Sequence, residues 1–141
     1  MKIVNINRAR QLNDFDNIMN GTLQPMDIDG FVEYNDLAYV FLEVKYLDKD
    51  LPARQRLAYE RIVKDTSNTP DKKLSIAIVV EHSVSEWQEH VPISECNVRE
   101  LYFSLDKKWR APNFKCTFNE LATHFIETVV RRNNEILIRD F

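Results

Sequence analysis

Three charged side chains interrupt apolar segments in the first third of the chain. Asp29 precedes the run Gly-Phe-Val, and Glu43 and Lys45 break the run Tyr-Val-Phe-Leu-Glu-Val-Lys-Tyr. Residues two apart on a strand point to the same face, so the side chains of Glu43 and Lys45 emerge together. Burying a charge is costly unless it finds an opposite charge or a metal. The spacing therefore predicts a shared polar site that holds an ion pair or a metal ion.

The turn between the two strands decides whether Asp29 reaches that site. A two-residue Asn-Asp turn would set Asp29 opposite Leu42, on the wrong face for Glu43. A loop one residue longer sets Asp29 opposite Glu43 and Asp27 opposite Lys45, within the roughly 4.5 to 5.5 Å that separates cross-strand Cβ atoms. We predict the longer loop, or an equivalent bulge, because it gathers the charges on one face.

The next helix adds two polar residues at a fixed spacing. Gln55 and Tyr59 are four apart, which places them on one helix face. The order of an acidic strand, a Glu43-Val-Lys45 strand and a Gln55-x-x-x-Tyr59 helix resembles the PD-(D/E)XK nucleases. The last motif is similar to that of their RecB-type and phage exonuclease branch. The resemblance covers about residues 25–60.

The resemblance implies both a fold and an activity. The fold is an α/β, restriction-endonuclease-like single domain over residues 1–141, with a central mixed β-sheet flanked by helices. The activity is hydrolysis of phosphodiester bonds in DNA, dependent on Mg²⁺ or Mn²⁺. The implied catalytic residues are Asp29, Glu43, Lys45, Gln55 and Tyr59.

The metal ligands implied by the resemblance are oxygen donors, which hard divalent cations prefer. They are the carboxylates of Asp29 and Glu43 and the backbone carbonyl of Val44. Asp27 lies on the same strand face as Asp29, so either aspartate could be the main ligand; the resemblance favours Asp29, because its distance to Glu43 fits the RecB-type pattern better. The other aspartate would then be a supporting residue or a ligand of a second metal.

The remaining implied residues act on the water and the phosphate. Lys45 would orient or activate the attacking water, or stabilise charge that develops in the transition state. Gln55 and Tyr59 would position the site and the phosphate. The motifs do not distinguish endonuclease from exonuclease action or one DNA structure from another.

The composition indicates one globular domain. The chain has 141 residues, of which 44% are hydrophobic and 29% charged, and this balance is typical of a domain with its own core. No apolar run approaches the roughly 18 to 20 residues that span a bilayer, and the N-terminal stretch lacks the apolar centre of a secretory signal. We therefore expect a cytoplasmic protein with no membrane partner, in which Cys96 and Cys116 are reduced thiols.

The net charge of −3 provides no global basic field for nucleic acid. A DNA partner would have to be held by a local basic strip, although a solvated helix face explains the same residues equally well. The strip consists of Arg54, Arg56, Arg61, Lys64, Lys72 and Lys73. Trp87 and Trp109 are candidates for stacking on bases, but packing is the commoner role of tryptophan.

Periodicity and turn residues predict the elements that position these side chains. Asp50 is the predicted N-cap of the second helix, with Pro52 in its first turn, and residues 117–120 form a capping box before the last helix. The predicted helices cover residues 7–20, 53–65 and the stretch from 117 onward, and the predicted strands cover residues 26–34, 37–47, 74–81 and 96–104.

Other interpretations compete with the nuclease hypothesis. Asp29, Glu43 and Lys45 would also suit a structural ion pair on a sheet face exposed to water. A non-cleaving DNA-binding or accessory protein on a nuclease fold is the alternative function, and a different metal-dependent hydrolase ranks third. A homo-oligomer or a larger DNA-processing complex is compatible with the sequence. A zinc site lacks the usual paired spacing; its ligands would be His82, His90, Cys96 and Cys116.

Overall fold

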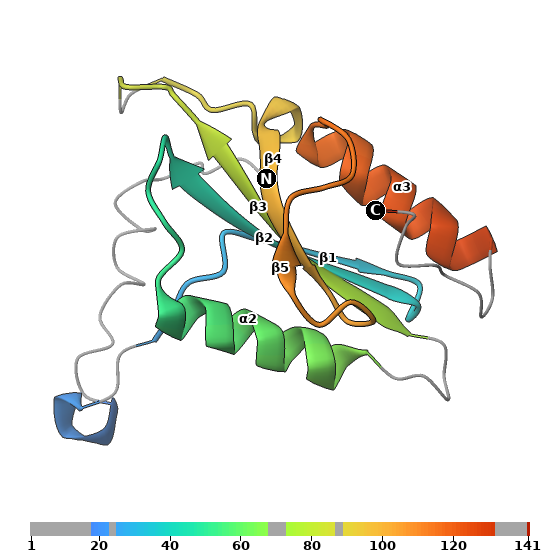
Figure 1. Ribbon diagram of the computed structural model, residues 1–141. Coiled ribbons are helices and arrows are strands. Elements are labelled where there is room, and N and C mark those ends of the chain that lie inside the picture. The colour runs from blue at the N-terminus through green and yellow to red at the C-terminus, as the bar shows by residue number, and fades with distance from the viewer. Residues whose placement is uncertain (1–17, 23–24, 68–72, 87–88, 132–140) are drawn as a thin grey trace.

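The computed structural model describes residues 18–22, 25–67, 73–86, 89–131 and 141. This part of the chain is an α/β domain built on a five-stranded mixed sheet in the order β1-β2-β3-β4-β5, with helices α2 and α3 beside it (Figure 1). The elements are η1 (Ile18–Gly21), β1 (Gly30–Tyr34), β2 (Ala38–Tyr46), α2 (Ala53–Thr66), β3 (Leu74–His82), η2 (Ile93–Glu95), β4 (Asn97–Phe103), β5 (Trp109–Arg110) and α3 (Phe118–Arg131). The predicted α/β class with a mixed sheet is confirmed.

The β1–β2 hairpin has the longer of the two loops considered. Tyr34 pairs with Ala38 and Gly30 with Leu42, which leaves residues 35–37 in the loop. The two residues after Tyr34 have φ of 47° and 61°, the left-handed region that Asn and Asp tolerate best among non-glycine residues. The predicted register is therefore confirmed, although β1 begins at Gly30 rather than at residue 26.

β3 is the central strand, as its sequence predicts. It runs parallel to β2 and antiparallel to β4, and residues 75–80 are all buried. A continuous apolar run is typical of a strand that is covered on both faces. β4 is the strand predicted over residues 96–104. The sequence did not predict β5, because two residues carry no periodic pattern; β5 places β4 one strand in from the edge.

The two helices cover opposite faces of the sheet (Figure 1). Alternation along the strands sends successive side chains to opposite faces, and two separate cores result. The core under α2 consists of Phe41, Leu51, Tyr59, Val63, Ala77 and Val79. The larger core under α3 includes Val40, Leu42, Ile76, Ile78, Leu101, Phe103, Leu121 and Phe125.

The start of α2 differs from the prediction. The N-cap position is Pro52, with no side-chain cap hydrogen bond, and the helix begins at Ala53. Asp50 is therefore not the N-cap; its carboxylate lies 3.7 Å from the Arg56 guanidinium instead. The reason is Leu51, which is 3% exposed in the core under α2. Burying this side chain fixes the path of the chain before the helix can begin.

The start of α3 is the capping box that the sequence predicts. The Thr117 N–H donates to the Glu120 carboxylate at 3.1 Å, and the Glu120 N–H donates to the Thr117 hydroxyl at 3.2 Å. These reciprocal bonds satisfy two donors that a helix start otherwise leaves unpaired. At the other end, the exposed Arg131 lies 3.5 Å from Glu127, one turn earlier in α3.

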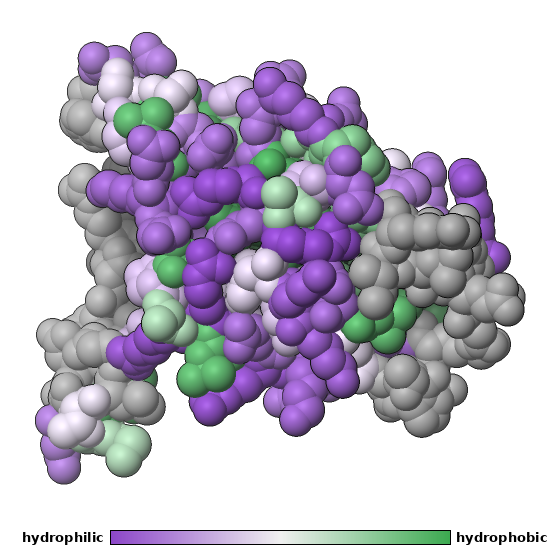
Figure 2. All heavy atoms as spheres, viewed as in Figure 1, coloured by the Kyte–Doolittle hydropathy of each residue, from purple (hydrophilic) through white to green (hydrophobic). Residues whose placement is uncertain are grey.

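Most of the first predicted helix lies outside the described residues. Its described end is η1, where Met19 and Asn20 have φ of 50° and 56°, so these residues are not part of an α-helix. Figure 2 shows a mainly hydrophilic face with small, separate hydrophobic patches. No helix in the described ranges is long and apolar enough to cross a membrane.

Candidate active site

Glu43 carries the most deeply buried charge of the site. It is 5% exposed on the sheet face that α2 covers. Its Oε1 lies 2.9 Å from the Nζ of Lys45, and its Oε2 accepts a 2.6 Å hydrogen bond from the Tyr59 hydroxyl. Burial and this bond raise the pKa of Tyr59 far above its ordinary value, so Tyr59 stays a neutral donor. Two donors thus compensate the burial of one carboxylate.

Lys45 connects the strand to the helix. Its side chain is 17% exposed, and its Nζ donates a hydrogen bond of 3.1 Å to the Oε1 of Gln55. Gln55 and Tyr59 lie one turn apart on the same face of α2, as predicted. The structure therefore brings the predicted Glu43, Lys45, Gln55 and Tyr59 into one connected polar network.

Asp29 reaches this network through the backbone of β2. Its Oδ2 accepts a hydrogen bond of 2.8 Å from the N–H of Val44. If β1 began earlier, the hairpin register would place Ile28 opposite Val44. The Val44 N–H would then donate to the backbone carbonyl of Ile28. The Asp29 carboxylate takes its place, and pairing ends at Gly30. Extended one step beyond Gly30, the register would place Asp29 at the level of Glu43, the position that the sequence predicts.

Asp27 does not occupy its predicted place. It is exposed in the stretch before β1, and the predicted pair of Asp27 with Lys45 is wrong because the paired strand begins only at Gly30. Its charge still contributes to the raised pKa of Asp29. Of the two aspartates, Asp29 is the one that contacts β2, which favours it as the main ligand.

The electrostatics of Asp29 reflect its crowded surroundings. Desolvation raises its pKa most, and the charge of Glu43 raises it further, while the Val44 N–H and Lys45 lower it. The net result is a pKa above the ordinary 3.8 of an aspartate. A carboxylate whose ionisation is disfavoured by burial and by a neighbouring carboxylate is stabilised in its charged form by a bound cation.

The donor set fits a divalent cation. Carboxylate oxygens that accept one hydrogen bond retain acceptor capacity, so Asp29 and Glu43 remain competent ligands. The N–H and C=O of a strand residue point to the same side, which places the Val44 carbonyl on the side of Asp29. Within the described ranges there is no group of three or more His, Cys, Asp or Glu side chains that could hold a metal. A cation here would complete its shell with water and phosphate oxygens, as Mg²⁺ commonly does.

A second network beside the site was not predicted. The Arg56 guanidinium lies 2.7 Å from the Glu100 carboxylate and 5.0 Å from the centre of the Trp109 ring. The Trp109 Nε1 in turn donates a 3.0 Å hydrogen bond to Glu60. These contacts fix α2 against β4 and β5. The residue in the sequence that could have predicted this network is Glu100, a charged residue among the apolar residues of β4.

A third carboxylate lies on the neighbouring strand. Glu81 pairs with Lys45 in the parallel β2–β3 register, so both side chains emerge on the α2 face of the sheet. Glu81 is partly buried. In the sequence, Glu81 is a charge at the end of an apolar run, a position that is also typical of a strand end.

Several other predictions concern packing and charge. Cys96 and Cys116 are free, buried thiols, as expected, and burial raises the pKa of both. Trp109 packs against both Arg56 and Tyr102, which supports the packing interpretation. Trp87 and Lys72 lie outside the described residues.

The basic residues of the predicted strip differ in their surroundings. Arg56 pairs with Glu100, and Lys73 donates to Asp36 at 2.6 Å. The other described members, Arg54, Arg61 and Lys64, are exposed along α2.

Comparisons of the chain with protein-family models, with curated proteins and with solved structures found no significant match. The geometry of the site is therefore the basis for its function. That site is a buried carboxylate held by a lysine and a tyrosine, beside a second carboxylate fixed by a backbone N–H.

Proposed function

We propose that the protein is a metal-dependent nuclease that hydrolyses phosphodiester bonds in DNA. The observation that supports this proposal is the single network that joins Glu43, Lys45, Gln55 and Tyr59 and lies directly beside Asp29. A plain ion pair on a water-exposed sheet face would not need burial. Here α2 covers the pair. Burying ions costs stability, and a catalytic role would explain why this cost is tolerated.

The two carboxylates and the Val44 carbonyl would hold the cation. When bound, Mg²⁺ or Mn²⁺ would polarise a phosphate oxygen and lower the pKa of a water molecule. Glu43 is held by two donors and Asp29 by one, so both ligands are oriented before any cation arrives. Preorganised ligands avoid reorganisation during the reaction.

Lys45 would act on the phosphate and the attacking water. Its Nζ is fixed between Glu43 and Gln55 at 2.9 and 3.1 Å, which leaves a third ammonium proton to donate. That proton can bond to a phosphate oxygen or to the water, and the charge stabilises the additional negative charge of the transition state. Gln55 and Tyr59 act as positioning residues because each bonds to a member of the pair.

The test is cleavage of labelled linear, circular and branched DNA in Mg²⁺, Mn²⁺ or EDTA. We expect cleavage by the wild type that EDTA abolishes and that Lys45→Ala reduces by a factor of about 100 or more. Lys45→Ala also leaves Glu43 without its cation, so its fold must be checked by circular dichroism. Asp29→Asn, at an exposed position, provides a second loss-of-function variant. The matched control is Lys115→Ala, an exposed lysine between β5 and α3.

One observation favours the alternative of a non-cleaving DNA-binding or accessory protein. Both oxygens of Glu43 already have protein partners, as in a purely structural network. Under this alternative, DNA would bind with equal affinity in Mg²⁺ and in EDTA, and no substrate would be cut. Full cleavage by Lys45→Ala would contradict the proposed mechanism and this alternative alike.

A further inference from the structure

A cavity of about 570 Å³ lies between the second half of α2 and the end of β4. Its volume is in the range of small-molecule sites, roughly 300 to 1,000 Å³. It is separate from the candidate active site, because no residue of that site lines it. The lining residues are Leu57, Glu60, Arg61, Lys64, Ser67, Leu74, Tyr102, Ser104, Leu105 and Lys107.

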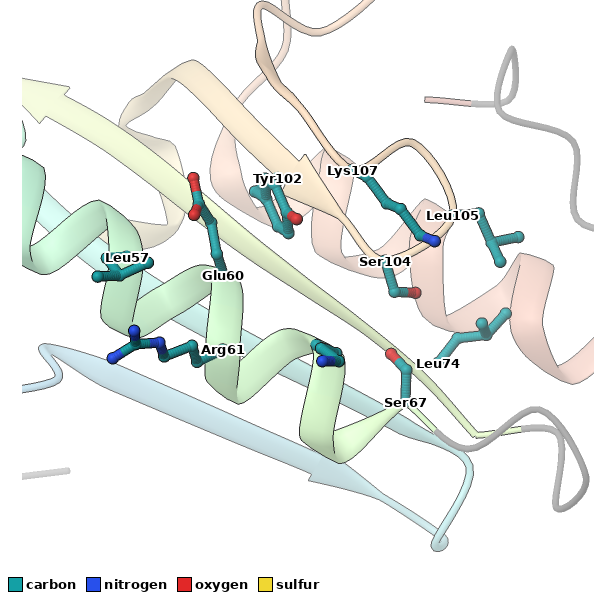
Figure 3. Close-up of a pocket in the computed structure, with 10 residues that line it drawn as sticks. Leu57, Glu60, Arg61, Ser67, Leu74, Tyr102, Ser104, Leu105 and Lys107 are labelled. Atoms are coloured by element: carbon teal, nitrogen blue, oxygen red, sulfur yellow. The ribbon is translucent and has the colours of Figure 1, made fainter.

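The charged lining favours an anion. Arg61 and Lys64 come from α2, and Lys107 comes from the turn after β4, against the single carboxylate of Glu60. Figure 3 shows Lys107 and Glu60 approaching the cavity from opposite elements. Lysine and arginine are the usual ligands of phosphate groups. An anionic group on the ligand is therefore expected near these cationic side chains.

The walls favour a planar apolar body. Tyr102 lies on the sheet side (Figure 3), and its ring is held at 5.4 Å from that of Trp109. Leu57 and Leu105 flank the cavity while 44% and 37% exposed. They lie at opposite ends of the cavity (Figure 3), and the Tyr102 ring between these ends is apolar surface on which a base or another flat ring would stack.

Two hydroxyl groups add a requirement for polar edges. The Oγ atoms of Ser67 and Ser104 are buried without a hydrogen-bond partner in the described structure, and both residues line the cavity. A buried hydroxyl without a partner is costly and calls for an explanation. Glu60 accepts a bond from Trp109 through Oε1 and, as a carboxylate, can accept more. Glu60 therefore offers an acceptor to an amino or hydroxyl group of a ligand, and a shift of the serine side chains toward the cavity would add two further partners.

We propose that this cavity binds a nucleoside monophosphate, with the base against Tyr102 and the phosphate at Lys64 and Lys107. A nucleotide combines in one molecule the anion, the planar ring and the polar edges that the lining requires. The nucleotide is either free or part of a DNA strand, and both sources present the same chemistry. This site is additional to the proposed nuclease centre and does not depend on it.

The experiment is a calorimetric or NMR titration of the full chain with dAMP, in EDTA so that cleavage cannot interfere. We expect saturable binding of dAMP that is at least about tenfold tighter than that of deoxyadenosine or inorganic phosphate, because each provides only part of the contacts. A double variant, Lys64→Gln with Lys107→Gln, should weaken dAMP binding by about tenfold or more while keeping side-chain length. Lys115→Gln is the matched control and should bind as the wild type does.

The source of the nucleotide is distinguished by a second titration with a short single-stranded oligonucleotide. Binding at least as tight as that of dAMP, and equally sensitive to the double variant, identifies a DNA strand as the source. Binding of dAMP alone identifies the free nucleotide. Either result supports the proposed site.

Three results would overturn the proposal. One is the lack of saturable binding at roughly 1 mM dAMP, the scale of weak affinity. Another is equal binding of inorganic phosphate, which would indicate a simple anion contact. The third is dAMP binding that survives the double variant but is lost in Lys45→Ala, which would place the ligand at the proposed active site and leave the nuclease proposal standing.

Discussion

Replacing Tyr59 by phenylalanine tests the buried centre of the site directly. The change removes the hydroxyl that donates 2.6 Å to Glu43 Oε2 and leaves the ring in the α2 core. A hydrogen bond to a charged group contributes about 1.5 to 3 kcal/mol. Because Glu43 is 5% exposed, water cannot readily replace the lost donor. We expect Tyr59→Phe to lower the free energy of unfolding by about 2 kcal/mol.

The assay is urea unfolding in EDTA, followed by circular dichroism and supported by thermal melts. A loss of about 2 kcal/mol corresponds to a fall in Tm of roughly 6 °C for a domain of this size. The matched control is Tyr34→Phe, a tyrosine that is 38% exposed on β1, which should change stability by less than about 0.5 kcal/mol.

A double-mutant cycle separates the charge from the packing. In a Glu43→Gln background the hydrogen bond is neutral, so Tyr59→Phe should cost only about 0.5 to 1.5 kcal/mol. An equal cost in the Glu43 and Gln backgrounds would refute the idea that the hydroxyl stabilises a buried charge. So would a Tyr59→Phe variant as stable as the control.

Three further predictions follow from single contacts. Asp29→Asn should raise the stability of the metal-free protein at pH 7. The pKa of Asp29 is raised, so ionisation of its carboxyl group costs stability as pH increases through that pKa. In urea titrations, the stability gained by the variant should therefore fade as pH drops below 3.8. Arg56→Ala removes the contacts to Glu100 and Trp109 and should cost about 1 to 2 kcal/mol, with a change in Trp109 fluorescence; an unchanged emission spectrum would contradict the packing described. Thr117→Ala removes one half of the capping box and should cost about 1 kcal/mol in thermal melts, whereas Thr123→Ala on the exposed side of α3 should cost little.

Local signals in the sequence were sufficient for most elements of the fold. The apolar run of β3, the Asn-Asp turn and the Thr117 capping box each act through neighbours in the chain, and each appears where it was predicted. The hairpin register was predicted from one requirement, namely that the charged side chains of Asp29, Glu43 and Lys45 lie on the same face of the sheet. The exact start of α2 did not follow, because burial of Leu51 in the core outweighs the local preference of Asp50 for a cap.

Sequence alone determined which residues form the candidate site, since strand alternation and helix spacing already place Glu43 with Lys45 and Gln55 with Tyr59. Only the tertiary structure decided how they meet. The bond from Tyr59 to Glu43 and the network around Arg56 join segments that are far apart in the chain, so no local pattern encodes them. The start of β1 at Gly30, directly after Asp29, was likewise decided by the tertiary structure, because the Asp29 carboxylate takes the place of a backbone carbonyl as the acceptor of the Val44 N–H.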